Sequence, residues 1–383
     1  MSNLGNDFKK YIREVNNRAC QPVGPPGLGL RQVNKVSQGS YGTVYKATFN
    51  NTGRRIAYKK INGNATRNGQ DRILGAEFEY KVAKKLKARG FDFVPEMYIY
   101  KICYGTTGYL YMEYLEGADF QRWMATSPSV DKVKSVLTQV AVNLYEIKKK
   151  IPGFRHHDLH GGNVIIRNVP RKDITWKVGD KTYKASNEGV SVTFIDFGMS
   201  TMPGLANPWI NNGGFRNFGI NRSKSHHMYD IHLFVNRSAY PYVKYNSKYR
   251  EVKRFIESVF PKTYLGRQNV VPTRNKMQNS YGLKLGGQHG TLPKFKDILS
   301  HPFLTGVSNM NAIKTFNKKM TSKLPRIRTK ERMMTKSNVI KKLGGKTKPK
   351  STNTKPKANT RVQRMLASMS RKPPLHPNLK TKR

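Results

Sequence analysis

The hydrophobic pattern of this chain changes its period near Ala118, and this change limits the possible fold more than any other feature. Three runs before Ala118 alternate apolar and polar side chains, as half-buried antiparallel strands do. These runs are residues 33–49, 54–61 and 97–115. One helix is expected among them at residues 76–88, and residues 130–149 place apolar side chains along one face of a long helix. We therefore expect a small β-rich lobe followed by a larger helical lobe.

The two ends of the chain differ from this central block in composition. The chain carries 71 Lys or Arg against 22 Asp or Glu, and residues 306–383 hold 23 of these cations with one acid, Glu331. Lys, Pro, Thr and Gly alternate in this tail, which predicts disorder and binding to nucleic acid or acidic proteins. Residues 1–30 are expected to form a basic helix and a Pro/Gly linker. Residues 31–305 then remain as one domain.

Cysteine content and hydropathy exclude several classes of protein. Cys20 and Cys103 are too few for a disulfide framework, so a reducing, intracellular compartment is expected. No run reaches the length of about 18 apolar residues that a membrane span needs, so no membrane association is expected. The N-terminal residues MSNLGNDFKKYIREV lack the apolar core of a signal peptide.

A glycine-bearing turn near the start of the domain is a candidate phosphate-binding element. It runs from Val36 to Val44 and contains Gly39, Ser40 and Gly42. Glycines let the backbone approach phosphate oxygens closely, and the flanking valines would cover an adenine. An ordinary hairpin turn has the same pattern, so this segment alone leaves both interpretations open.

The following strand supplies a candidate cation for those phosphates. Alternation directs Ala57 and Lys59 to one face, which places a small side chain beside the base and an ammonium beside the phosphates. A carboxylate from the helix at residues 76–88 would hold Lys59 in place. Glu79 is preferred over Glu77, which lies about 200° away around the helix.

Two segments farther along carry the residue types that phosphoryl transfer requires. The segment HHDLHGGNVII contains Asp158, His160 and Asn163, and the segment TFIDFG contains Asp196. Asp158 would accept the proton of an attacking hydroxyl, while Asn163 and Asp196 would hold Mg²⁺ against the phosphates. A structural Asp in a turn explains any one of these residues, but it does not explain the whole set in this order.

With these motifs, residues 31–305 resemble the eukaryotic-type protein kinase family, and they look most like divergent kinases of large DNA viruses. The resemblance implies a two-lobed α+β fold that uses ATP and Mg²⁺, with an N-lobe at residues 31–115 and a C-lobe at residues 116–305. It also implies that residues 298–303 close the domain. The long gap between Asn163 and Asp196 would hold an extended hairpin.

The same resemblance implies further site residues. Met112, Glu113 and Leu115 stand where the family has its gatekeeper and hinge beside the adenine, and Asp119 stands where the family has a ribose-binding acid. Asp230 resembles the aspartate that opens the large helix beneath the active site.

The sequence departs from the family at several positions. Ser37 replaces the first glycine of the phosphate loop, and no Ala-Pro-Glu follows Gly198. His157 replaces the arginine that receives an activating phosphate, so activity without phosphorylation is expected. His160 replaces a lysine that touches the transferred phosphate, and we expect His160 to assist there. These departures keep a small-molecule phosphotransferase as an alternative to a Ser/Thr protein kinase with a protein substrate.

Two more interpretations stay open. A non-catalytic protein that binds polyanions, as part of a virion or scaffold, would keep the fold without the chemistry. A viral origin would place the chain in the host cytoplasm or the virion. His226, His227, Asp230 and His232 are also close enough in sequence for a zinc site, but a packed helix start with exposed histidines is the preferred interpretation.

Overall fold

The computed structural model of this protein describes part of the chain. The described residues are 30–39, 42–49, 53–63, 67–103, 107–211, 227–260, 265 and 293–306. The expected N-terminal helix and linker, the basic tail after Gly306 and Ser40 of the glycine-bearing turn lie outside these ranges. Among the helices within them, none combines the length and the apolar character that crossing a membrane requires.

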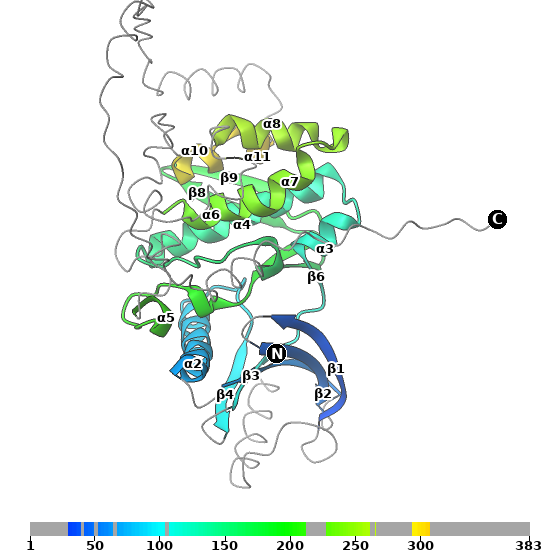
Figure 1. Cartoon of the computed structure of the whole chain (residues 1–383). Helices are drawn as coiled ribbons and strands as arrows, with labels where there is room; N and C mark the ends of the chain where they lie inside the picture. Colours follow the sequence, from blue (N-terminus) through cyan, green and yellow to red (C-terminus); the bar gives the residue numbers. More distant parts are fainter. Residues whose placement is uncertain are drawn as a thin grey trace, which may run out of the picture. The chain divides into compact units, whose positions relative to one another are not determined.

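A five-stranded antiparallel sheet forms the first lobe (Figure 1). In spatial order its strands are β1 (Leu30–Gly39), β2 (Gly42–Phe49), β3 (Arg55–Asn62), β5 (Thr107–Glu113) and β4 (Met97–Cys103). One face of the sheet has an aromatic core, where Tyr58 stacks on Tyr45 with 5.0 Å between the ring centroids and contacts Tyr111. Since side chains alternate along β3, Ala57 and Lys59 point to the other face.

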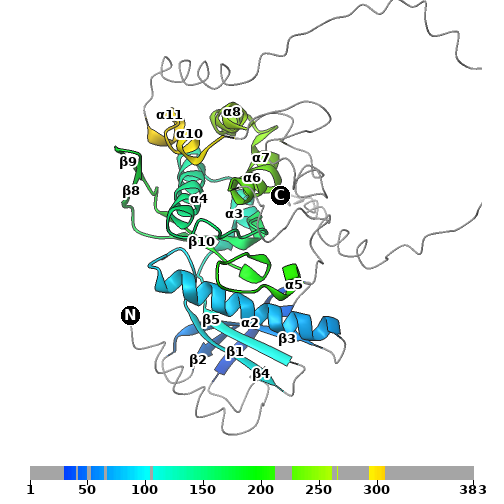
Figure 2. The ribbon, with the colours of Figure 1, turned by 90° about the vertical axis from the view of Figure 1, so that its left-hand side faces the viewer.

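Helix α2 (Arg67–Ala88) lies across the sheet and contacts β3, β4 and β5 (Figure 2). Val82 and Leu86 are fully buried in this contact. The expected helix start at Ala76 is wrong, because the helix begins at Arg67. Its first turns have the sequence RNGQDR, which contains no apolar residue, and so no hydrophobic period marks them in the sequence.

Helix α4 (Val130–Lys150) forms the centre of the second lobe. The apolar positions that predict this helix are all buried, namely Val133, Leu137, Val140, Leu144 and Ile147. Ser129 caps its start, because the Oγ atom accepts a hydrogen bond from the amide of Lys132 at 3.3 Å. The helix therefore forms where its periodicity and its capping residue agree.

Short elements surround α4. A three-stranded sheet consists of β6 (Ala118–Asp119), β7 (Val164–Asn168) and β10 (Val190–Phe194). The helical elements are α3 (Phe120–Ala125), α6 (Tyr229–Phe234), the π-helical turn η4 (Val235–Ala239), α7 (Tyr240–Val243), η5 (Ser247–Tyr249), α8 (Arg250–Val259), α10 (Phe295–Leu299) and α11 (Pro302–Thr305). A β-rich lobe and a helical lobe are thus both present, as the sequence predicts (Figure 1).

An antiparallel hairpin fills the long gap between Asn163 and Asp196. Its strands are β8 (Asp173–Val178) and β9 (Lys181–Ser186). Trp176 anchors the hairpin to the helical lobe, because its buried indole donates a hydrogen bond to the carbonyl oxygen of Leu299 at 3.1 Å and stacks on Tyr183. The expected extended hairpin is therefore present and packs on the end of α10.

His301 closes the helical lobe at the start of α11. Its Nδ1 atom accepts a hydrogen bond from the amide of Phe303 at 3.0 Å, and its ring packs edge-on against Phe255. Only 2% of the residue is exposed, and this burial lowers the pKa of His301 to about 4. The ring is therefore neutral in the folded protein at neutral pH.

The substitution His301→Asn keeps a side-chain acceptor for the amide of Phe303 and removes the ionisable ring. The unfolded pKa of a histidine is about 6.5, so the unfolded wild type binds more protons than the folded one between about pH 4 and 6.5. As the pH falls through this window, the wild type should lose up to about 1.4 kcal/mol of stability per pH unit more than the variant.

Urea unfolding of both proteins from pH 7 to pH 4 measures this difference. His157, whose pKa burial also lowers to about 4, is present in both proteins and cancels. Parallel stability curves would show that His301 does not titrate as its environment implies.

Candidate active site

Lys59 connects three segments that are distant in the sequence. Its Nζ atom lies 2.8 Å from Oε2 of Glu79 on α2 and 3.2 Å from Oδ1 of Asp196, which follows β10. Lys59 and Glu79 are both buried. Glu77 pairs instead with Lys81, one turn along the exposed side of α2. The structure thus pairs Lys59 with Glu79 and not with Glu77.

The charges of this cluster follow from burial and pairing. Burial disfavours the ammonium of Lys59, but the carboxylates of Asp196 and Glu79 outweigh it and raise the pKa of Lys59. Burial likewise favours the neutral form of Asp196, and the charge and hydrogen bond of Lys59 outweigh it and lower the pKa of Asp196. Burial also raises the pKa of Glu79. Lys59 therefore faces two acidic side chains, and Asp196 is the one whose ionised form is favoured, which suits binding of a divalent cation.

Asp230 fixes the backbone of residues 156–163, the catalytic-loop segment, by hydrogen bonds from another element. This residue opens α6 as the sequence analysis expects, and 3% of it is exposed. Its two carboxylate oxygens accept hydrogen bonds from the amides of His156 and His157, each at 2.8 Å. Asp158, the candidate proton acceptor, follows directly, so its backbone position is set by a buried carboxylate on another element.

Asn163 ends the short helix η1 (Gly161–Asn163) and faces Asp158. Its Nδ2 atom donates to the backbone oxygen of Asp158 at 2.8 Å and to the Oδ2 atom of Asp158 at 3.3 Å. Because both partners are acceptors, the amide has only one possible orientation, and Oδ1 is directed elsewhere. That oxygen and the carboxylate of Asp196 are the hard ligands that suit Mg²⁺.

The described residues contain no cluster of three or more His, Cys, Asp or Glu that could hold a metal ion. Mg²⁺ is commonly held by one or two carboxylates together with phosphate oxygens, so Asn163 and Asp196 fit it without such a cluster. His226 of the zinc alternative lies outside the described residues, and the residues within them form no such cluster. His232 is completely buried against Phe260, which corrects the expectation of exposed histidines at this helix start.

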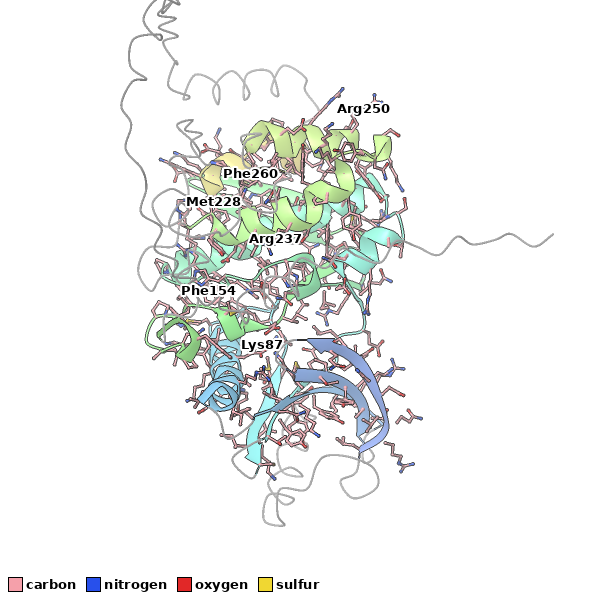
Figure 3. All side chains as sticks on the ribbon, in the orientation of Figure 1. Lys87, Phe154, Met228, Arg237, Arg250 and Phe260 are labelled. Carbon is pink, nitrogen blue, oxygen red and sulfur yellow. The ribbon has the colours of Figure 1, made fainter. Side chains whose placement is uncertain are left out.

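His160 lies beside the candidate catalytic carboxylate of Asp158. Its Nδ1 atom accepts a hydrogen bond from the amide of Gly162 at 3.0 Å, so the neutral ring carries its proton on Nε2. Nε2 lies 3.8 Å from Oδ2 of Asp158. Burial raises the pKa of Asp158, and the nearby His160 and Arg237, which lies on η4 (Figure 3), act in the opposite direction.

Two site residues have left-handed backbone conformations that are uncommon for residues other than glycine. Asp196, at the start of η2 (Phe197–Met199), has a φ of 63°, and His157 has a φ of 64°. The amide of Ile195 donates to the backbone oxygen of Asn163 at 3.0 Å, which fixes the chain just before Asp196. Backbone strain of this kind clusters at functional sites.

The glycine-bearing turn has two kinds of glycine. A Cβ atom at Gly42 would overlap the carbonyl oxygen of Lys60, so glycine is needed there for the close approach of β2 and β3. Among the described residues, a Cβ atom at Gly39 would meet only the backbone oxygen of Gly42, at 4.0 Å, which is an ordinary contact. Val36 is 41% exposed on β1, and Val44 is half-buried on β2.

The residues expected beside the adenine lie at the end of the sheet. Ala57 pairs with Met112 across β3 and β5, and Leu115 is half-buried just beyond β5. The carboxylate of Glu113 accepts a hydrogen bond from the amide of Glu96 at 3.1 Å, so the side chain of Glu113 supports the strand end. The backbone amide of Glu113 in turn donates to the backbone oxygen of Glu96 at 2.8 Å, so neither the side chain nor the amide of Glu113 is free for a base.

Asp119 has a role that the sequence analysis missed. Its Oδ1 atom accepts hydrogen bonds from the amides of Gln121 and Arg122, both at 3.0 Å, and its Oδ2 atom pairs with the guanidinium of Arg122. Asp119 is therefore the N-cap of α3. The pattern of an Asp directly before a helix could have indicated this role.

Ser238 is a second residue that the sequence analysis missed. Its buried Oγ atom accepts a hydrogen bond from the amide of Gly161 at 2.6 Å, and this bond supports the catalytic-loop segment. Ser238 lies in the π-helical turn η4, whose wider spacing departs from the 3.6-residue period. No sequence pattern marks that turn.

A small cavity, partly open to solvent, lies between α2 and the segments that carry Asp158 and Asp196. Lys59, Glu79, Asp158 and Asp196 all line this cavity. The four residues come from β3, α2, the loop before η1 and the end of β10, and the fold brings them to one place.

Comparison with known proteins gives a family match for part of the chain. A family model described as "Protein kinase domain" matches residues 30–207. Haspin of Mus musculus, a serine/threonine-protein kinase, is 30% identical over 86 residues, which are 22% of this chain and 11% of haspin. R400, a serine/threonine-protein kinase candidate of Acanthamoeba polyphaga mimivirus, is 23% identical over 196 residues, which are 48% of this chain and 40% of R400.

A further relative is zyg-1 of Caenorhabditis briggsae, which is named as a serine/threonine-protein kinase. It is 32% identical over 153 residues, which are 39% of this chain and 20% of zyg-1. The chain spans less than half the length of these curated relatives. Its fold and its relatives identify residues 30–207 as part of a divergent protein kinase domain.

Proposed function

We propose that this chain is a protein kinase that depends on ATP and Mg²⁺ and transfers the γ-phosphate of ATP to a Ser or Thr hydroxyl of a protein. The observation that carries the proposal is the position of Lys59 between Glu79 and Asp196. Asp158 lines the same cavity, and Asn163 is hydrogen-bonded to Asp158. A charge arrangement of this kind fits phosphoryl transfer, in which positioning and electrostatics supply most of the catalysis.

Each side chain has a part in this reaction. Lys59, held by Glu79, binds the α- and β-phosphates of ATP. Asp158 orients the attacking hydroxyl and accepts its proton, and the Nε2 hydrogen of His160 donates to an oxygen of the transferred phosphate. Asn163 and Asp196 would hold Mg²⁺, which when bound offsets the charge of the phosphates.

The nucleotide base has its own set of residues. Val36 and Val44 cover one side of the adenine, and Ala57 leaves room beside it. The backbone oxygen of Glu113 offers a hydrogen-bond acceptor to the base at the strand end, next to Met112. Leu115 completes the apolar surface, and Asp119 would lie toward the ribose. The backbone of Gly39 and Gly42 would approach the phosphates.

Asp158→Asn and Asp196→Asn should each lower phosphate transfer at least a hundredfold, because each removes a charge that acts in the transition state. Asp173→Asn is the matched control, because Asp173 is an exposed carboxylate on β8 that pairs only with Lys184 among the described residues. An assay with labelled ATP measures the transfer. Its acceptors are casein, histone, a basic protein and free aminoglycosides, so the labelled product also identifies the acceptor class.

Thermal unfolding of all three variants shows whether the fold is kept. Transfer by Asp196→Asn within a few-fold of the wild type would rule out the proposed catalytic site. Labelling of aminoglycosides in preference to every protein would favour the small-molecule phosphotransferase.

We also propose that residues 306–383 bind nucleic acid or an acidic protein, because 23 Lys or Arg stand there against one acid. Deleting these residues should weaken binding to a DNA duplex and lower the dependence of the affinity on salt, since fewer counterions are released. Fluorescence anisotropy at several salt concentrations measures the affinity of the full chain and of the deletion variant, and the slope of each affinity against salt. Identical slopes for the two proteins would show that another part of the chain binds the polyanion.

A further inference from the structure

Asn207 connects two parts of the segment that follows β10. Its Nδ2 atom donates hydrogen bonds to the backbone oxygens of Gly198 and Ser200, at 2.9 and 2.8 Å. Its Oδ1 atom accepts a hydrogen bond from the amide of Trp209 at 2.9 Å. Only 4% of Asn207 is exposed. One buried side chain therefore ties the loop after Asp196 to the beginning of the next helix.

That helix, α5 (Pro208–Asn211), lies beside α2 in the structure (Figure 2). Trp209 makes the closest approach, because a Cβ atom at Gly75 would overlap the Nε1 atom of the indole. Glycine in a helix costs about 1 kcal/mol relative to alanine, so this close contact accounts for a glycine inside α2. Gly75 and Glu79 are four residues apart and lie on the same helical face.

Other contacts hold the same segment. The Nζ atom of Lys85 on α2 donates to the backbone oxygen of Pro203 at 2.9 Å. Arg155 and Thr201 exchange backbone hydrogen bonds, at 3.1 and 2.8 Å, which joins the segment to the start of the catalytic loop. The segment is thus attached to α2 through Lys85 and to the start of the catalytic loop through Arg155, and neither attachment needs a phosphate group.

His157 offers no charge with which to bind a phosphate. The residue is 2% exposed, and its Nδ1 atom donates to the backbone oxygen of Met199 at 3.3 Å. Burial lowers the pKa of His157 to about 4, so the ring is neutral at neutral pH. A neutral buried ring is a poor receptor for a phosphate group.

We propose that Asn207 and Trp209 are positioning residues that hold α2 against the loop at Asp196 and keep the Lys59–Glu79 pair assembled without a phosphate on residues 198–211. This inference rests on the proposed function for its catalytic readout. The connection runs from Gly198 through Asn207 and Trp209 to Gly75, and then along one turn of α2 to Glu79.

The chain offers a matched control for Asn207. Asn187 is 1% exposed, its Nδ2 atom donates to the backbone oxygen of Pro170, and its Oδ1 atom accepts from the amides of Lys172 and Gly189. It therefore makes as many side-chain hydrogen bonds as Asn207, but it lies at the base of the β8–β9 hairpin. Asn187→Ala and Asn207→Ala should lose similar stability.

The first experiment compares these two variants as full-length, phosphatase-treated proteins. Asn207→Ala should lower kcat at least tenfold and raise the KM for ATP, whereas Asn187→Ala should keep both within about twofold. Hydrogen exchange of the α2 amides should become faster in Asn207→Ala only. Equal exchange and equal kinetics in the two variants would overturn the proposal.

The second experiment is a double-mutant cycle on Gly75 and Trp209. Gly75→Ala alone should lower kcat about tenfold, because its methyl group displaces the indole. In a Trp209→Ala background the same change should alter kcat by less than about twofold, because the methyl group then has space. Additive effects of the two substitutions would contradict a direct contact that positions α2.

Hydrogen exchange separates this inference from the proposed function. If the wild type transfers no phosphate but Asn207→Ala and Gly75→Ala still accelerate exchange in α2, the positioning role stands and the kinase assignment fails. If the wild type is active only before phosphatase treatment, the positioning role fails and the kinase assignment stands.

Discussion

The burial of one ammonium group between two carboxylates is the constraint on which the rest of the structure depends. A buried Lys is costly unless it is paired, and Lys59 is paired with Glu79 and Asp196 from two other segments. The β-rich lobe, α2 and the end of β10 must therefore meet at one point. The same contact favours the ionised form of Asp196, where the proposed metal would bind, so the contact that joins the segments also prepares the site for its chemistry.

The parts of this account that follow from the sequence are those with a local pattern. Strand alternation places Ala57 and Lys59 on one face. Helical spacing predicts α4 and favours Glu79 over Glu77. Alternation and helical spacing are both fixed periods of the backbone. The parts that sequence reasoning missed depend on contacts between distant segments. Ser238 reaches Gly161 only because of a π-helical turn, and Asn207 acts through carbonyl oxygens that any residue would carry. Gly75 of α2 packs against Trp209, a contact that no local period reveals.

The segment after Asp196 shows how the departures from the protein kinase pattern fit together. His157 is buried and neutral where the family has an arginine, and the segment is joined instead by Asn207, by the backbone pairing of Arg155 with Thr201, and by the packing of Trp209 on α2. Neutral hydrogen bonds and packing replace ion pairs that would require a phosphate. An assembly of this kind is set when the chain folds and needs no later modification.

Calorimetric titration with a non-hydrolysable ATP analogue, with and without Mg²⁺, tests the central claim most directly. The ionised carboxylate of Asp196 repels the phosphates until a divalent cation binds beside it. Mg²⁺ should then strengthen binding at least tenfold, about 1.4 kcal/mol, in the wild type, and the effect should disappear in Asp196→Asn. Equal affinity of the wild type in Mg²⁺ and in EDTA would contradict the account.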